Sequence, residues 1–157
     1  YKDEKRESRT FAAVSRDLHS WQVLGAEITD CAQEGPNVFE LDGIRWMISD
    51  YWNGLAVYRS ADFRNWTRCP DILRESGTRP MDVGFAHHAD VLVKDGKSYI
   101  IYFCHPYADE GKAEEDGNGI FTERERNMAV VQAAQLKVQN GILICDRNAP
   151  VIWEMME

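Results

Sequence analysis

The chain has 157 residues, about the size of one domain and enough to bury a substantial core. Its 18 basic and 26 acidic residues give a net charge of −8 at pH 7, which argues against nucleic acid or an anionic membrane surface as a partner. Hydrophobic residues make up 44% of the chain and charged residues 28%, a composition that excludes a disordered protein. No apolar run approaches the length of a membrane span.

Two seven-residue segments of the chain repeat one another. Residues 15–21 read S-R-D-L-H-S-W and residues 60–66 read S-A-D-F-R-N-W, so both follow the pattern S-x-D-[LF]-x-x-W. The repeat is offset by 45 residues, as from Asp17 to Asp62, and a short apolar segment precedes each copy. A period of about 40–45 residues is typical of the four-stranded blades of a β-propeller.

Three Asp-Gly or Asn-Gly pairs interrupt apolar segments of the chain. They lie at residues 42–43, 95–96 and 140–141, and β-branched and aromatic residues flank each pair. Both central residues of a type I′ turn need positive φ, which these residues adopt readily, so the pairs predict three β-hairpins. No long stretch shows helical periodicity. We therefore predict an all-β fold of four-stranded antiparallel sheets.

The repeats and hairpins predict one domain, residues 1–157, that forms about two and a half blades of a five-bladed type of propeller. Residues 1–28 would end one blade, residues 29–75 would form a full blade, and residues 83–150 would form the last blade, with a long acidic loop at residues 108–127. This length cannot close a propeller ring. We therefore expect either a fragment of a longer protein or a homo-oligomer that covers the open blade edges.

Glu34 is the first candidate catalytic residue. It begins the sequence Glu34-Gly35-Pro36, directly before a predicted strand of the full blade. Because the first strand of each blade lines the central channel of a propeller, the carboxylate would lie at the channel mouth. Gly35 would allow a ligand or backbone to approach closely, and Pro36 would fix the start of the strand. The alternative is that Glu34 is an ordinary turn residue.

A short D-Y-W-N-G link between two predicted strands supplies further candidates. Such links lie at the channel rim of a propeller, where an aromatic ring can stack on a sugar. We therefore predict Asp50 and Trp52 as substrate-binding residues, with packing at the blade edge as the alternative for Trp52. Asp82 is another acidic residue that could lie near the rim. Trp21 and Trp66 recur in the repeats, and we expect both in the core.

Three histidines complete the candidate site. His87 and Glu34 each lie eight residues before an Asp-Gly turn, so the repeat places His87 at the channel position that matches Glu34. Adjacent residues of a strand point to opposite faces, so we expect at most one of His87 and His88 to face the channel. Either could bind substrate or ligate a metal, and His105 could reach the same rim. A structural role is the alternative for all three.

These residues resemble the five-bladed propeller glycoside hydrolases of family 43 and their relatives in families 32, 62 and 68. The resemblance rests on Glu34-Gly35-Pro36, on the two S-x-D-[LF]-x-x-W repeats and on the strand that opens H-A-D-V at residues 88–91. It covers nearly the whole chain, but only the C-terminal portion of such an enzyme.

The resemblance implies inverting hydrolysis of an arabinofuranoside or β-xyloside bond, with Glu34 as the general acid. It places His88 at the position of a channel histidine, with a structural calcium as the one metal to consider and no required cofactor. The general base and a second aspartate would lie outside this chain, so the chain alone would be incomplete or inactive. The implied partner is carbohydrate, as an oligosaccharide or a plant cell-wall polysaccharide.

Two alternative functions remain open. One is a non-catalytic carbohydrate-binding propeller, in which Glu34 binds a sugar hydroxyl. The other is a family 32-like fructosidase, against which Glu-Gly-Pro in place of Glu-Cys argues mildly.

The cysteines bear on the cellular compartment. None of the four forms a CxxC pair, and we expect free thiols at Cys31, Cys69, Cys104 and Cys145. Unpaired cysteines favour a reducing compartment, and therefore a cytoplasmic location over secretion.

Overall fold

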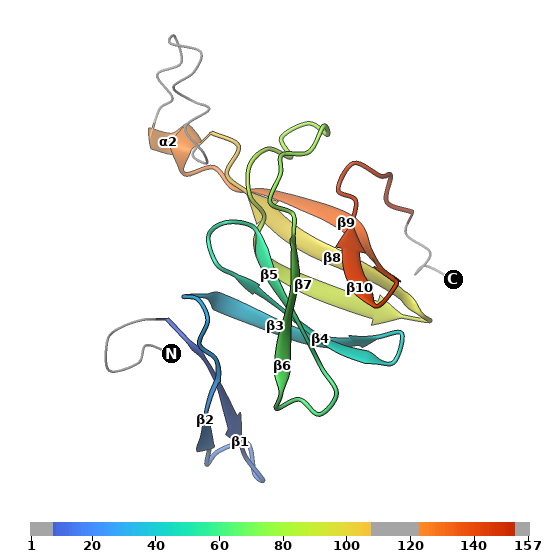
Figure 1. Cartoon of the computed structure of the whole chain (residues 1–157). Coiled ribbons are helices and arrows are strands. Elements are labelled where there is room, and N and C mark those ends of the chain that lie inside the picture. The colour runs from blue at the N-terminus through green and yellow to red at the C-terminus, as the bar shows by residue number, and fades with distance from the viewer. Residues whose placement is uncertain (1–7, 108–122, 153–157) are drawn as a thin grey trace.

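The computed structural model describes residues 8–107 and 123–152. These residues form three antiparallel sheets and one helical turn, α2 (Glu123–Arg126), as Figure 1 shows. The predicted all-β fold class is confirmed. Most of the acidic loop that we expected at residues 108–127 lies outside the described residues.

The sheets have two, four and four strands, and within each sheet the strands follow chain order. β1 pairs with β2, the middle sheet has the order β3-β4-β5-β6, and the last sheet has the order β10-β9-β8-β7. The strands are β1 (Thr10–Val14), β2 (Gln22–Ile28), β3 (Glu34–Leu41), β4 (Ile44–Asp50), β5 (Leu55–Ser60), β6 (Trp66–Ile72), β7 (His87–Lys94), β8 (Lys97–Cys104), β9 (Val130–Gln139) and β10 (Ile142–Cys145). This is the architecture of two propeller blades and part of a third.

The three predicted hairpins are present at the expected turns. They connect β3 to β4, β7 to β8 and β9 to β10. The Asp or Asn of each turn has a φ between 51° and 54°, and the Gly has a φ between 71° and 74°. Positive φ at both positions is the requirement of the type I′ turn, so the sequence signal and the geometry agree.

The two sequence repeats form the same turn in two different sheets. Asp17 and Asp62 each use one carboxylate oxygen to accept the backbone N–H groups of the second and third residues that follow, at 2.7–2.9 Å. Leu18 and Phe63 both have a φ of 61°. These backbone hydrogen bonds lower the pKa of Asp17 to about 2. The β1–β2 hairpin therefore corresponds to the β5–β6 hairpin of the complete sheet.

The middle sheet has apolar contacts on both of its faces. One face packs against the last sheet in the main core, which includes Trp46, Ile48, Leu55, Val57, Ile100, Tyr102, Ala134, Leu136 and Leu143. The other face packs against β2 in a smaller cluster of Ile28, Met47, Ala56 and Tyr58. This explains the sequence of β5: a strand that is buried on both faces needs a continuous apolar run rather than alternation.

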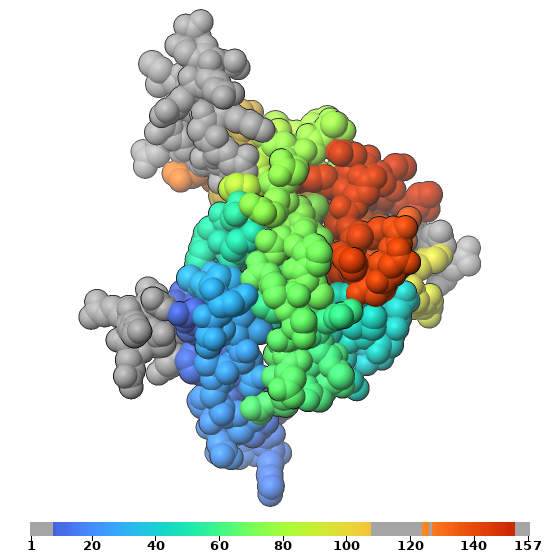
Figure 2. All heavy atoms as spheres, viewed as in Figure 1, coloured from blue at the N-terminus to red at the C-terminus, as the bar shows by residue number. Residues whose placement is uncertain are grey.

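The two repeated tryptophans have different surroundings. Trp66 packs against the smaller cluster and is partly buried, as we expected of a core residue. The expectation for Trp21 is wrong, because 59% of the residue is exposed. The β1–β2 sheet has only two strands, and it projects from the body of the molecule in Figure 2. A ring in the same repeat position therefore finds much less apolar surface to cover it.

The cysteines carry free thiols in the structure, as expected; Cys104 is buried and the other three are partly buried. The cytoplasmic location stays a prediction. No helix within the described residues is long and apolar enough to cross a membrane.

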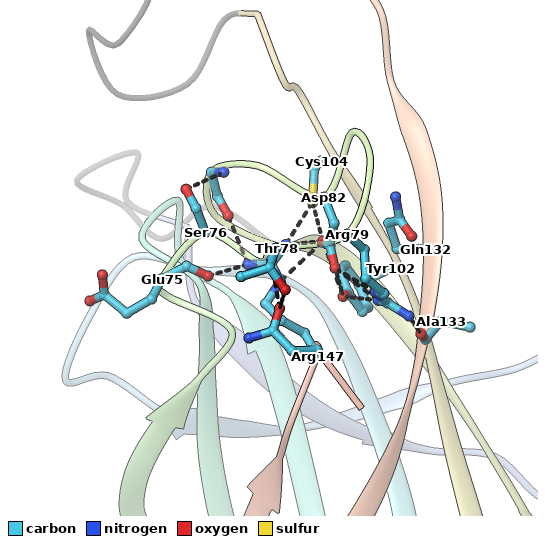
Figure 3. A network of polar contacts seen from close by, with 12 residues as sticks. Glu75, Ser76, Thr78, Arg79, Asp82, Tyr102, Cys104, Gln132, Ala133 and Arg147 are labelled. Atoms are coloured by element: carbon cyan, nitrogen blue, oxygen red, sulfur yellow. Dashed lines mark hydrogen bonds and ion pairs between the residues drawn. The ribbon is translucent and has the colours of Figure 1, made fainter. Parts of the chain in front are cut away.

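Asp82 lies in the interior rather than at a rim. Its carboxylate accepts hydrogen bonds from Arg79 at 2.8 Å, from Arg147 at 3.0 Å and from the Tyr102 hydroxyl at 3.0 Å (Figure 3). Arg147 also donates to the carbonyl oxygens of Glu75 and Gly84. Burial alone would raise the pKa of Asp82, but the two guanidinium groups hold it below its usual value. The network ties the link between the two large sheets to β8 and to the segment after β10.

Replacing Asp82 tests this network. We expect Asp82→Asn to lower the free energy of unfolding by about 3–5 kcal/mol, because it removes the counter-charge of two guanidinium groups. Asp95→Asn is the matched control in an exposed turn that accepts Asn, and its effect should stay within about 0.5 kcal/mol. Urea unfolding at neutral pH measures both. An Asp82→Asn loss no larger than that of the control would contradict the role of the network.

The same carboxyl predicts a pH dependence of stability. Because its folded-state pKa lies below the ordinary value of 3.8, Asp82 stabilises the fold above that pH. The stabilisation is lost as the pH falls through the lower, folded-state value. The difference in unfolding free energy between the wild type and Asp82→Asn should therefore shrink in acid, and a difference that grew would contradict this assignment.

Candidate functional site

The ends of three strands bring four of the predicted site residues together. Glu34 begins β3 and pairs in register with Asp50, the last residue of β4, while His87 and His88 begin β7. Glu34 Oε1 lies 2.8 Å from His88 Nε2, and Asp50 Oδ2 lies 3.1 Å from His87 Nδ1. Two carboxylates thus meet two imidazoles across the junction of the two large sheets.

The backbone leaves regular strand geometry at this junction. The registers of β3 and β7 both shift within their first residues, and φ is +56° at Gly35 and +33° at His88. Such irregularities change the direction in which side chains point. The rings of His87 and His88 both stack on Phe103, with centroid distances of 5.6 and 6.1 Å.

Glu34 and His88 form the exposed half of the cluster. Their side chains are 44% and 47% exposed, whereas the side chain of His87 is 10% exposed and that of Asp50 is 1% exposed. Repeat counting favours His87 as the match of Glu34, whereas the family resemblance favours His88. In the structure it is His88 that contacts Glu34, while His87 lies beneath it beside Asp50.

Asp50 is covered, and both of its oxygens accept hydrogen bonds. Oδ1 accepts the backbone N–H of Trp52 at 2.8 Å, and Oδ2 accepts the backbone N–H of His88 at 3.2 Å in addition to its contact with His87. Burial by itself raises the pKa of Asp50, but the hydrogen bonds from His87 and from these two backbone groups lower it below its usual value. A substrate-binding role for Asp50 stays a prediction, without exposed surface in support.

Trp52 and His105 flank this cluster. Trp52 follows β4 with a φ of +61°, and 46% of the residue is exposed, so its ring is open to a ligand. His105 Nδ1 lies 3.0 Å from the Met128 carbonyl oxygen, and its ring contacts those of His87 and Phe103. His105 is thus placed behind the histidine pair, next to the end of β8. Substrate-binding roles for these residues also stay predictions.

Phe103 is the one member of the cluster that we did not single out as a site residue. It pairs in register with His87 and carries both histidine rings. Its position near the end of an apolar strand looks like that of any core residue. The available signals were its place opposite the predicted start of the histidine strand and its part in the family resemblance, as Tyr102-Phe103 near His105.

A hollow beside Glu34 provides space for a ligand. It has a volume of about 350 Å³ and is lined by residues 8–11 and 33–36. A larger hollow of about 490 Å³ lies between β6 and β10, and none of the predicted site residues lines it. Of the predicted site residues only Glu34 lines the smaller hollow. The cluster around this exposed carboxyl is the candidate functional site.

The residues that converge here do not fit calcium well. One oxygen each of Glu34 and Asp50 and one nitrogen of His88 lie within 4.8 Å of one another. Calcium prefers six to eight oxygen ligands, whereas Asp50 already accepts three hydrogen bonds and His88 offers a nitrogen. We therefore derive no chemical step through calcium, and a calcium site stays a prediction.

Comparisons with solved structures place this fold among propeller glycoside hydrolases. The family 32 β-fructofuranosidase BmSUC1 of Bombyx mori is similar at a TM-score of 0.56 and 15% identity over 88% of this chain. A thermostable family-43 glycoside hydrolase is similar at a TM-score of 0.52 and 16% identity over 88% of this chain. The family 43 protein BlXynB from Bacillus licheniformis is similar at a TM-score of 0.50 and 16% identity over 82% of this chain.

These similarities confirm the expected resemblance at the level of fold. No protein-family model matches the chain, and no curated protein matches it either. The chain spans 31%, 47% and 27% of the lengths of the three structures. It therefore shares part of the propeller fold of these family 32 and family 43 glycoside hydrolases.

Gly35 offers a direct test of the close contact between β3 and His88. A Cβ atom at Gly35 would lie 2.8 Å from His88 Nδ1, whereas a Cβ at Gly43 would meet nothing within 4 Å. Both glycines have positive φ, so each Ala substitution should cost about 1–3 kcal/mol in backbone strain. We expect Gly35→Ala to cost more than Gly43→Ala and to shift the imidazole resonances of His88. Equal losses of stability with unchanged histidine resonances would contradict the packing.

Proposed function

We propose that this chain carries the general-acid part of a propeller glycoside hydrolase, with Glu34 as the acid. The observation that carries the proposal is a half-exposed carboxyl at the start of the first strand of a complete four-stranded sheet, beside a hollow and paired with a histidine. The partial propeller fold supports it. We propose an arabinofuranoside or β-xyloside as the substrate, as the Glu-Gly-Pro sequence favours.

The contact between Glu34 and His88 suits proton transfer. At 2.8 Å one of the two facing atoms must carry a proton, and the proposal requires that proton on Glu34, whose O–H then donates to Nε2 of a neutral His88. In the proposed reaction Glu34 gives a proton to the departing glycosidic oxygen as the bond to the anomeric carbon breaks. A water molecule attacks that carbon from the opposite face and loses its own proton to a general base.

The base must come from outside the described residues of this site. Inverting enzymes hold their two carboxyl groups about 6.5–9.5 Å apart, so that a water molecule fits between substrate and base. The Asp50 oxygen lies within 4.8 Å of that of Glu34, and Asp50 is covered. It is therefore too close and too enclosed to activate that water. We expect the chain alone to turn over substrate very slowly, and a homo-oligomer that covers the open blade edges stays a prediction.

Two other functions have support in particular observations. The neighbour with a TM-score of 0.56 is a β-fructofuranosidase, which keeps a fructoside substrate open for this chain. Because Asp50 does not serve as the base, a non-catalytic carbohydrate-binding role also stays open, in which Glu34 and Trp52 contact a sugar without cleaving it.

The effect of Glu34→Gln on different leaving groups tests the acid. In a preparation that hydrolyses glycosides, either this chain or a longer polypeptide that contains it, the substitution should slow xylobiose or arabinobiose cleavage by about 10²–10⁴-fold. Cleavage of the matching p-nitrophenyl glycosides should slow much less, because p-nitrophenolate leaves without protonation. Binding of the disaccharide should remain.

Several outcomes of this experiment are decisive. Equal losses on both substrates would contradict a general-acid role for Glu34. Sugar binding without hydrolysis in any preparation would favour the carbohydrate-binding alternative. Robust turnover by the purified 157-residue monomer would contradict the proposal that the base lies elsewhere. Hydrolysis of fructosides but not of xylosides or arabinosides would change the substrate class.

The role of Trp52 is tested by binding. We expect Trp52→Ala to weaken binding of xylotriose or arabinotriose about tenfold, which corresponds to about 1.4 kcal/mol, because a stacking surface is lost. Trp21→Ala is the matched control, since that indole is exposed but lies on the β1–β2 hairpin. Calorimetric titration measures both variants, and equal affinities for Trp52→Ala and the wild type would remove Trp52 from the site.

A further inference from the structure

We infer that Asp50 is the positioning residue of this site: its buried carboxylate holds Trp52 and His88 in place and makes no substrate contact of its own. The functional meaning of this inference rests on the proposed function, because that proposal gives Glu34, His88 and Trp52 their roles. The contacts of Asp50 do not depend on it.

The first argument is the set of groups that Asp50 binds. Its oxygens accept the backbone N–H of Trp52, which lies in the link after β4. They also accept the backbone N–H of His88 and contact the ring Nδ1 of His87, both at the start of β7. One partner thus comes from the link between β4 and β5 of the middle sheet, and the other two come from the last sheet. Hydrogen bonds to an ionised acceptor are roughly twice as strong as neutral ones. A single carboxylate thus fixes the position of the exposed indole relative to the imidazole that contacts Glu34.

The second argument is the backbone conformation of the two residues whose N–H groups Asp50 accepts. Trp52 has a φ of +61° and His88 has a φ of +33°. Neither is a glycine, so each conformation costs about 1–3 kcal/mol and persists only where the surroundings enforce it. The hydrogen bonds that Asp50 accepts from both backbone N–H groups hold the two residues in these conformations. Without them, the backbone at either residue could relax and carry its side chain away from the site.

The third argument is chemical: the geometry requires a carboxylate and not merely a polar residue. Oδ1 accepts one backbone N–H and Oδ2 accepts another, whereas asparagine has one oxygen and an NH₂ group in place of the second. With its oxygen on Trp52, the asparagine NH₂ would face the backbone N–H of His88, donor against donor. The His87 ring can move its proton from Nδ1 to Nε2 and then accept a hydrogen bond from the asparagine NH₂ group. A backbone N–H can only donate, so His88 would lose its acceptor.

The matched control for this argument is Asp62. Its Oδ1 alone accepts both backbone N–H groups of its turn, and Asn65 Nδ2 donates to the other oxygen. An asparagine oxygen can therefore keep both backbone contacts. Asp50→Asn and Asp62→Asn make the same chemical change, but only the first removes the acceptor of a backbone N–H.

The experiment is NMR of the 157-residue chain labelled with ¹⁵N, for the wild type and both variants. We expect His87 to carry its proton on Nδ1 in the wild type and on Nε2 in Asp50→Asn. We also expect the amide resonances of Trp52 and His88 to move and their hydrogen exchange to accelerate, while Asp62→Asn leaves all of them unchanged. Should Asp50→Asn fail to fold, hydrogen exchange of the wild type still decides: both amides should be protected.

Two results would overturn the inference. One is a wild type in which the Trp52 and His88 amides exchange as fast as those of exposed turns. The other is a folded Asp50→Asn variant in which the His87 tautomer and these two amides are the same as in the wild type.

A binding measurement separates this inference from the proposed function. If the wild type binds xylotriose or arabinotriose, Asp50→Asn should weaken binding at least as much as Trp52→Ala, because it also releases His88, and the double variant should lose no more than Asp50→Asn alone. Additive losses would mean that Asp50 does not act through Trp52, which would overturn the inference. If the wild type binds neither sugar, the proposed function loses its support, while the NMR result still decides the positioning role.

Discussion

The candidate site depends on one constraint: the first strands of the two large sheets cannot begin as regular β-structure. The registers of β3 and β7 shift at their start, and Gly35 and His88 take positive φ. A regular β7 would send neighbouring side chains to opposite faces. The irregular one places two imidazoles on one phenylalanine ring and opposite two carboxylates. The chemistry at this junction is thus a product of local backbone distortion.

Two buried carboxylates hold the two large sheets in this arrangement. Asp50 connects the end of β4 with the start of β7, and Asp82 connects the link between the sheets with β8 and the segment after β10. Each is surrounded by donors, which is the condition under which a buried charge is tolerated. Apolar packing alone would allow the sheets to slide on each other, whereas these hydrogen bonds specify one relative position.

Much of the fold could be predicted because its signals are local. The Asp-Gly and Asn-Gly turns and the repeated Asp turns are determined by residues within a few positions of one another, and they adopt the expected conformations. Counting residues to equivalent turns placed His87 at the strand position that matches Glu34, and each is the first residue of its strand, although it is His88 that contacts Glu34. The equivalence of blades is enough to place residues on corresponding strands.

What could not be predicted depends on contacts between distant residues or on missing neighbours. The sequence around Asp82 does not show that two arginines contact its carboxylate, one of them 65 residues away. Trp21 occupies a core position of the repeat, but its sheet has only two strands. The stacking of both histidines on Phe103 accompanies a positive φ at His88. Since His88 is not a glycine, its residue type does not predict that conformation.

The difference between local turns and distant carboxylate contacts also implies an order of folding. The Asp62 turn closes over three residues, whereas the Asp50–His87 contact spans 37 residues and the Asp82–Arg147 contact spans 65. Because the entropy cost of closing a loop rises with its length, hairpins can form while the sheets are still separate. The Glu34–His88 pair spans 54 residues and joins those sheets. The candidate site therefore comes into existence only when one finished sheet docks on the other.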